Sequence, residues 1–280
     1  MEWEKAKSHI LLFFLLLNLA LGGLLFMESR RYTVTPEREQ SIIEILNRNN
    51  ITMDTRLLRR FSPMRAMHVT GFYDDTDELV RIFFGNASVQ RDVDFRGYRV
   101  RRSPAELLIS NGFISYVNPR GRGELAELTP TEARRLTDAF VRTNWPDFRL
   151  DDIYVGEDML LLSYRKVYRG HMIHSSFIEF VVTDYGIVRV EMQFSQVLGW
   201  HGTGQPIVSP DEALLTFVQR MRAHAQVSPI VITHMDLVYF QEDGSHSPYV
   251  QHLAVPFYRV FIAGDGDPFL INAFSNEMFN

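Results

Sequence analysis

Residues 209–218 read SPDEALLTFV and residues 129–133 read TPTEA, so one helix-start motif occurs twice in the chain. Each copy places a hydroxyl residue at the N-cap, proline at the first helical position and glutamate at the third. Together these residues form a capping box with a proline start. An apolar-periodic stretch follows each copy and predicts an amphipathic helix. Residues 35–37 (TPE) and 103–106 (SPAE) predict two further helix starts.

Strand-like runs follow both main helix starts. Residues 159–167, 176–183 and 187–198 come after the first, and residues 231–241, 255–263 and 269–274 come after the second. Short turns rich in aspartate and glycine separate them, which is typical of antiparallel hairpins. The predicted fold class is therefore α+β, with antiparallel sheets packed against helices. Because Ser209 lies 80 residues after Thr129, the pattern suggests an internal duplication, with units 125–203 and 204–280.

The chain before these units predicts a separate N-terminal α+β lobe over residues 28–124. Residues 68–72, 78–84, 98–102 and 112–117 alternate apolar and polar side chains and predict strands. Residues 201–204 (HGTG) lack the lysine and hydroxyl residue of a phosphate loop, so we expect a turn between the two C-terminal units.

An apolar run near the N-terminus predicts a membrane helix. Ile10–Phe26 reads ILLFFLLLNLALGGLLF, 17 residues without a charge. At about 1.5 Å rise per residue this is at the short end of what spans a bilayer. We expect a tail at residues 1–8 and a membrane helix at residues 9–27. A cleaved signal peptide is the alternative, but the apolar run continues past its candidate cleavage site at residues 20–22.

Asn18 is the one strongly polar side chain in this run. Helical spacing places it on one face with four apolar or small residues, which are Leu11, Phe14, Gly22 and Leu25. This face is a candidate helix–helix interface, because an amide in hydrocarbon needs a hydrogen-bond partner and glycine permits close approach. The alternative is that Asn18 bonds to its own preceding turn.

Charge is distributed unevenly along the chain. The net charge is −5 overall, made up of +3 over residues 28–124 and −8 over residues 125–280. A bulk nucleic-acid binder would be more basic, so we expect no nucleic-acid partner. Arg99, Arg101 and Arg102 form a candidate patch for an anionic surface. The alternative is a solvated strand face neutralised by nearby acidic residues.

The sequence contains no motif that predicts catalysis. It has no cysteine, which excludes disulfides and thiolate chemistry. His171 and His174 are three residues apart on a predicted strand, so they point to opposite faces and cannot share a metal. The acidic pairs at residues 74–75, 151–152 and 157–158 lie beside turns, where solvated carboxylates are expected. We therefore expect no cofactor, no metal and no enzymatic activity.

Four segments carry a resemblance to a known family. They are residues 1–19 (MEWEKAKSHILLFFLLLNL), 45–53 (ILNRNNITM), 198–218 (LGWHGTGQPIVSPDEALLTFV) and 269–274 (FLINAF). They resemble YycI (WalI), the membrane-anchored regulatory protein of the Gram-positive cell-wall two-component system. The resemblance implies an N-terminus inside the cell, residues from about 28 onward outside it, and a domain reminiscent of PepSY modules. It implies no active-site residues.

The partners implied by this resemblance are a sensor histidine kinase, a YycH-like companion protein and the membrane. Charge alone leaves the orientation open, because Lys5 and Lys7 precede the apolar run while Arg30 and Arg31 follow it. Two other functions fit the sequence. One is a PepSY-like extracytoplasmic module that restrains a secreted peptidase or binds cell-wall material, and the other is a wall-modifying hydrolase.

Overall fold

Five helices and fifteen strands form the part of the chain that the computed structural model describes. That part comprises residues 2–71, 75–94, 97–110, 112–123, 125–223, 229–241, 250–264 and 266–279. The side chains of residues 2, 4–6, 8, 24–30 and 94 lie outside it. The helices are α1 (Glu2–Arg31), α2 (Pro36–Arg48), α3 (Thr76–Phe84), α4 (Pro130–Asn144) and α5 (Pro210–Ala223).

The strands join into one large sheet. They are β1 (Ile51–Met53), β2 (Met64–Gly71), β3 (Gln90–Asp94), β4 (Gly97–Arg102), β5 (Ala105–Ser110), β6 (Phe113–Val117), β7 (Phe148–Val155), β8 (Leu160–Tyr168), β9 (His171–Thr183), β10 (Gly186–Gln193), β11 (Ser195–Gln205), β12 (Ile230–Gln241), β13 (Gln251–Ile262), β14 (Phe269–Asn272) and β15 (Met278–Phe279). Their main order is β11-β2-β13-β12-β9-β10-β6-β5-β4-β3. Most pairs are antiparallel, while β12 pairs with β1 and β9 in parallel. The predicted α+β class is confirmed.

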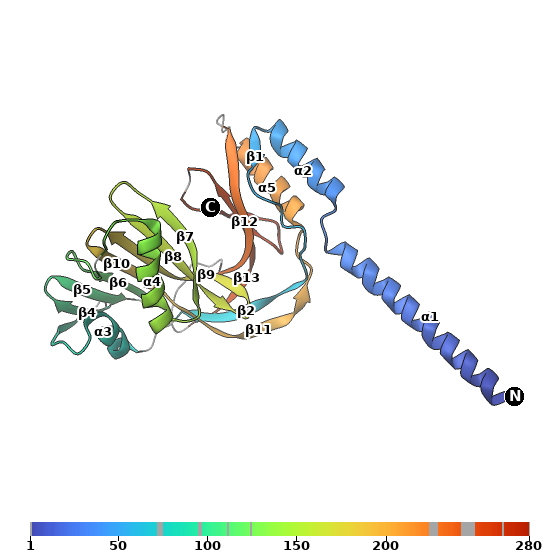
Figure 1. Cartoon of the computed structure of the whole chain (residues 1–280), viewed down its shortest axis with the longest axis horizontal. Coiled ribbons are helices and arrows are strands. Elements are labelled where there is room, and N and C mark those ends of the chain that lie inside the picture. Colours follow the sequence, from blue (N-terminus) through green and yellow to red (C-terminus); the bar gives the residue numbers. More distant parts are fainter. Residues whose placement is uncertain are drawn as a thin grey trace.

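Two separate apolar cores divide the molecule into two lobes (Figure 1). We call residues 32–71 and 195–279 the split lobe, because β2 pairs with β11 and β13 across the long intervening segment. Residues 75–194 form the inserted lobe, whose core lies beneath α3 and α4. The cores therefore group the chain differently from the expected lobes 28–124 and 125–280, since long-range strand pairing outweighs proximity in sequence.

Three of the predicted helix starts begin helices. Thr35 and Thr129 are N-caps, as expected, and accept hydrogen bonds from the backbone N–H groups of Arg38 (3.4 Å) and Glu132 (3.3 Å). At α5 the backbone N–H of Ser209 donates to the Glu212 carboxylate at 3.2 Å, which is one half of a capping box. The Ser209 hydroxyl, however, accepts from Arg38 at 2.8 Å.

Two local predictions are wrong. Residues 103–106 do not start a helix, because they contain the turn between β4 and β5 and these strands pair along their length. Residues 78–84 form most of helix α3 instead of a strand. The Asp75 carboxylate caps this helix by accepting from the Glu78 N–H at 2.8 Å. The buried residues of the helix, Leu79, Val80, Phe83 and Phe84, recur at helical spacing.

Each of the two long C-terminal helices is followed by an antiparallel meander. Strands β7 to β10 pair in chain order after α4, and β12 to β15 do so after α5. The predicted turn at residues 184–186 joins β9 and β10. The HGTG segment is not a turn, because residues 201–204 belong to β11, which pairs with β2.

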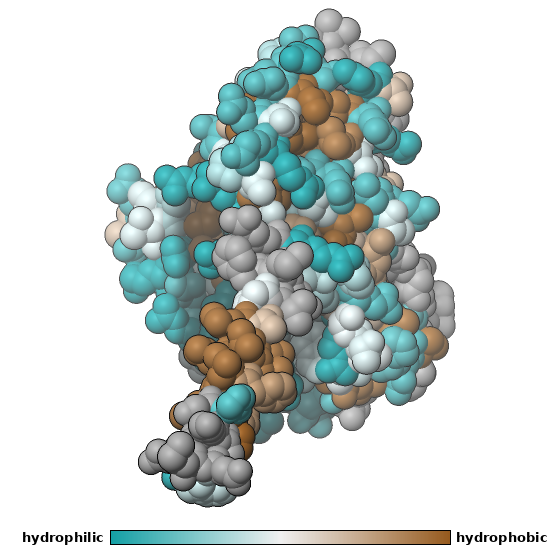
Figure 2. Space-filling model, turned by 90° about the vertical axis from the view of Figure 1, so that its right-hand side faces the viewer, coloured by the Kyte–Doolittle hydropathy of each residue, from teal (hydrophilic) through white to brown (hydrophobic). Residues whose placement is uncertain are grey.

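Helix α1 extends away from both lobes (Figure 1). Its large apolar side chains from Ile10 to Leu21 are 42–70% exposed. They form a continuous apolar surface in Figure 2. Over the side chains that the structure describes, no helix contains a stretch both long and apolar enough to cross a membrane.

Candidate functional site

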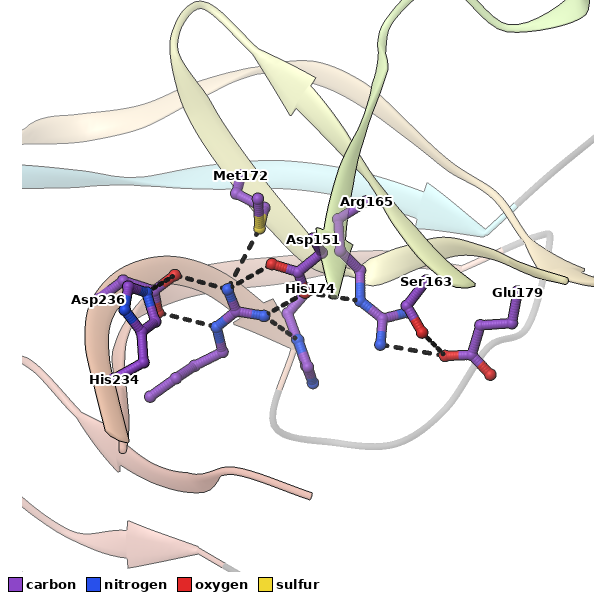
Figure 3. A network of polar contacts seen from close by, with 9 residues as sticks. Asp151, Ser163, Arg165, Met172, His174, Glu179, His234 and Asp236 are labelled. Carbon is purple, nitrogen blue, oxygen red and sulfur yellow. Dashed lines mark hydrogen bonds and ion pairs between the residues drawn. The ribbon is translucent and has the colours of Figure 1, made fainter. Parts of the chain in front are cut away.

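A buried arginine joins the two lobes (Figure 3). Arg259 lies on β13 of the split lobe and is 1% exposed. Asp236 faces it across the β12–β13 pair, where Nε and Nη2 donate to the two carboxylate oxygens at 2.8 and 2.5 Å. From the inserted lobe, Asp151 accepts from Nη1 at 2.6 Å and from Nη2 at 2.8 Å. Arg259 is thus bound in a bidentate manner on both sides.

Irregularities in two strands of the inserted lobe place its side chains against Arg259. The register of β7 against β8 shifts between Leu150 and Asp152, which leaves Asp151 without a cross-strand partner. The register of β8 against β9 shifts between Arg165 and Lys166, so β9 residues 174–176 also lack partners on β8. Bulges re-aim side chains. Here they bring Asp151 and His174 onto Arg259, where the His174 Nδ1 lies 3.3 Å from Nη1.

A second arginine extends the network. Arg165 on β8 donates from Nη2 to Glu179 on β9 at 3.1 Å, and its Nε lies 3.5 Å from Asp151. Ser163 is 3.4 Å from the same Glu179 oxygen. The Nε and Nη1 atoms of Arg165 are buried and have no hydrogen-bond partner among the described residues. Arg165 is therefore held by charge more than by hydrogen bonds.

The network shifts several pKa values. Burial raises the pKa of Asp151, but hydrogen bonds and charge from Arg259 outweigh it, so the net pKa is lowered. Burial, together with the adjacent charges of Arg165 and Arg259, lowers the pKa of His174 to about 3. His174 is consequently neutral at pH 7. Asp151, Asp236 and Glu179 form ion pairs with the two guanidinium groups.

A cleft of about 580 Å³ opens beside this network. Strand β7 forms one wall, and the ends of β12 and β13 with residues 266–268 form the other. Arg165, His174 and Glu179 line it, together with the exposed carboxylates Asp152 and Asp267. The described residues include no group of three or more His, Asp and Glu side chains able to hold a metal ion. Residues of both lobes therefore line the cleft.

Sequence reasoning missed this network. The expectation that Asp151 is solvated was wrong, because its side chain is 9% exposed and bound to Arg259. A usable signal existed, since Arg259 and Asp236 each have apolar residues on both sides in their strands. Of the other acidic pairs, Glu157 and Asp158 are exposed as expected, and Asp74 lies outside the described residues. His171 and His174 contact different partners, Trp200 and Phe240.

The structure describes most of the predicted face on α1. Leu11 and Phe14 are 70% and 55% exposed, and nothing lies within 4 Å of the position that a Cβ on Gly22 would occupy. Asn18 donates from Nδ2 to the Phe14 carbonyl at 2.8 Å, which is the alternative in which the amide bonds to its own preceding turn. The side chain of Leu25 lies outside the described part of the chain.

The predicted arginine patch is divided by strand alternation. Arg99 and Arg101 share one face of β4, while Arg102 shares the other face with the buried Val100. Glu106 forms ion pairs with Arg99 at 3.3 Å and Arg101 at 2.9 Å. Figure 1 places β4 at the end of the molecule opposite to α1.

Comparisons with known proteins give a fold and no family. No protein family matches the chain, and no curated protein sequence matches it. An uncharacterized protein from Eubacterium rectale has a similar structure, with a TM-score of 0.56 and 10% sequence identity over 82% of this chain and 91% of that one. The C-terminal domain of Bacillus megaterium YpeB gives a TM-score of 0.42 at 9% identity, over 74% of this chain and 97% of that domain.

Proposed function

We propose that this protein is a single-pass, membrane-anchored regulator of a cell-wall sensor histidine kinase, acting outside the cytoplasm through protein contacts. The observation that carries the proposal is α1, whose apolar side chains are exposed on every side of the helix. A helix that is apolar all round needs an apolar environment. Counted in the sequence, the uncharged run from Ile10 to Phe26 has 17 residues and would span roughly 25 Å as a helix.

The kinase as partner rests on the resemblance to the YycI family, which also implies a YycH-like companion. The interlobe network supports a role in contacts over a role in catalysis. Asp151 and Asp236 both bind Arg259 in a bidentate manner. The pKa of Asp151 is lowered, and an ion-paired carboxylate with a lowered pKa is a poor general base at neutral pH.

Affinity purification tests this proposal. The tagged full-length chain is isolated from native membranes in mild detergent, and co-purifying proteins are identified by mass spectrometry. We expect a sensor histidine kinase among them. Absence of any kinase would contradict the proposal. A reporter that is active only in the cytoplasm, fused after Asn280, should stay silent, and a signal from it would contradict the extracytoplasmic placement.

The role of α1 is tested by substituting residues 9–27 with an unrelated membrane-spanning helix. We expect the hybrid to stay in the membrane and to lose kinase regulation. Full activity of the hybrid would favour the alternative, a PepSY-like module that restrains a peptidase or binds wall material. Within the native helix, Asn18→Leu and Gly22→Leu should weaken kinase co-purification. Leu16→Ala, which lies off that face, is the matched control.

A further inference from the structure

Strand β7 has an unpaired edge that faces the interlobe cleft. Among the described residues it pairs with β8 alone. Five consecutive residues of β7, Asp151–Val155, line the cleft. Successive side chains of a strand point to opposite faces, so a surface that touches all five must also meet the strand's edge. The backbone N–H and C=O groups on that edge are available to a further strand.

The chain has other sheet edges, but they differ from β7. The main sheet ends at β3 and β11. Neither strand contributes a residue to the cleft. In β7 the exposed edge adjoins the groove formed by β12, β13 and residues 266–268 of the other lobe. This arrangement gives an incoming strand both a hydrogen-bonding edge and a second wall.

The charges that line the cleft indicate what could enter. Four carboxylates line it, and they face two guanidinium groups. Arg259 forms ion pairs with Asp151 and Asp236, and Arg165 forms one with Glu179. Asp152 and Asp267 remain, both exposed, and no described cation pairs with either of them. The charges of the cleft that lack a partner are therefore negative, and they favour a basic occupant.

Side-chain alternation along β7 sets which side chains a bound strand would meet. Asp152 pairs with Ser163 and Tyr154 with Leu161, so Asp152 and Tyr154 share the face of β7 that turns toward Arg165 and Glu179. Tyr154 is 54% exposed and offers an apolar surface two residues from the free carboxylate. A strand laid beside β7 would place alternate side chains next to these two.

We propose that this cleft binds an extended peptide segment of a partner protein, which adds to the edge of β7 as a further strand and places a lysine or arginine beside Asp152. An apolar side chain two positions away lies against Tyr154. The segment is recognised by backbone hydrogen bonds and one charge, so a short exposed strand or tail of the partner suffices. This inference goes beyond the proposed function and depends neither on α1 nor on the kinase.

The test measures peptide binding to the full-length protein in detergent micelles by fluorescence anisotropy. The probe is a labelled heptapeptide, Thr-Val-Lys-Val-Lys-Val-Thr, compared with its glutamate counterpart and with a version N-methylated at alternate residues. We expect the lysine peptide to bind more tightly than the glutamate peptide. N-methylation should weaken binding by about tenfold or more, because it removes the hydrogen bonds that add a strand.

Charge inversion in the protein tests the same contact from the other side. Asp152→Lys should weaken binding of the lysine peptide by about fivefold to tenfold and improve binding of the glutamate peptide. Asp184→Lys makes the same charge change in the exposed β9–β10 turn and serves as the matched control. Hydrogen exchange should show new protection at residues 151–155 when the lysine peptide is added.

Three results would overturn the proposal. They are equal binding of the N-methylated peptide, equal effects of the two charge inversions, and protection that appears away from β7. Concentration-dependent dimers whose β7 amides are protected without peptide would show that a second copy is the occupant instead. Because the peptide assay uses no kinase, its failure leaves the proposed function untouched, and failure of kinase co-purification leaves the cleft proposal untouched.

Discussion

Two arginine clusters in this protein use the same chemistry in opposite settings. In the interlobe network, the Arg259 side chain is 1% exposed and bound by two carboxylates. On β4, Arg99 and Arg101 are 28% and 41% exposed and share the carboxylate of Glu106, and Arg101 also pairs with Asp92 at 3.5 Å. The first cluster bridges strands of two lobes, and the second lies on three neighbouring strands of one lobe, β3 to β5.

Burial makes the difference between the two clusters. At the surface, water competes for each charge, and an ion pair adds little to stability. Inside, each charge has lost its hydration, so removal of one partner leaves the others uncompensated. The interlobe network should therefore behave as a single unit that sets how the lobes meet, while the β4 cluster should tolerate change.

The largest expected effect follows from Arg259→Leu. This change leaves Asp151 and Asp236 without their cation in a largely buried site, which should cost about 3–5 kcal/mol in unfolding free energy. Denaturant titration followed by tryptophan fluorescence measures it. The variant that combines Arg259→Leu with Asp151→Asn and Asp236→Asn should recover part of the loss. A cost below about 1 kcal/mol for Arg259→Leu would show that the network is not a buried unit.

The second-largest expected effect is a loss of stability at low pH. The pKa of His174 is lowered to about 3 in the folded protein, compared with its ordinary value of 6.5. Between these values the unfolded chain binds the additional proton, so stability is complete above pH 6.5 and falls as the pH drops toward 3. The loss should be on the order of 3–5 kcal/mol. The lowered pKa of Asp151 adds to this loss at the acid end.

His174→Asn keeps an acceptor near Arg259 but removes the titrating ring. Its plot of unfolding free energy against pH should be flatter between pH 6.5 and 4 than that of the parent protein. His201→Asn makes the same change at an exposed histidine on β11 and is the matched control. Parallel curves for His174→Asn and the parent would place the acid sensitivity elsewhere.

A smaller effect is expected at the surface cluster. Glu106→Gln removes the shared carboxylate of Arg99 and Arg101, and we expect a loss of about 0.2–1 kcal/mol that fades with added salt. The same titrations measure it at low and high ionic strength. A salt-independent loss as large as that of Arg259→Leu would erase the distinction between the two clusters.

The smallest effect concerns membranes. If Arg99, Arg101 and Arg102 seat the protein on an anionic surface, each would contribute about 1 kcal/mol before screening. Because Glu106 already pairs with two of them, we expect the triple Arg→Gln variant to lose only a few-fold in affinity for anionic vesicles. Vesicle flotation at increasing salt measures this. Binding equal to that of the parent would leave the patch as a solvated strand.

Sequence reasoning succeeded where the signal was local. The α+β class, the caps at Thr35 and Thr129 and most C-terminal strands follow from residues a few positions apart. It failed at residues 78–84, because these seven residues were read as strand alternation although their buried positions recur at helical spacing. The capping motif at residues 103–106 misled because strand pairing of β4 with β5 overrode it.

The interlobe network could not be predicted from local patterns. Asp151 and Arg259 are 108 residues apart, and a bulge in β7 brings them together. A bulge changes which face a side chain takes and leaves no periodic trace in one sequence. The same is true of the edge of β7, since whether a strand is at an edge depends on every other strand in the sheet.

The insertion of one lobe within the other has a consequence for biosynthesis. The inserted lobe is one continuous segment, so it can fold as soon as residue 194 has emerged. β2 ends at Gly71, and its neighbour β13 begins only at Gln251. At about 5–20 residues per second, β2 waits roughly 10–35 seconds for that partner. The split lobe, next to α1, is thus the last to be completed. A nascent chain shorter than about 260 residues has a folded inserted lobe and an incomplete split lobe.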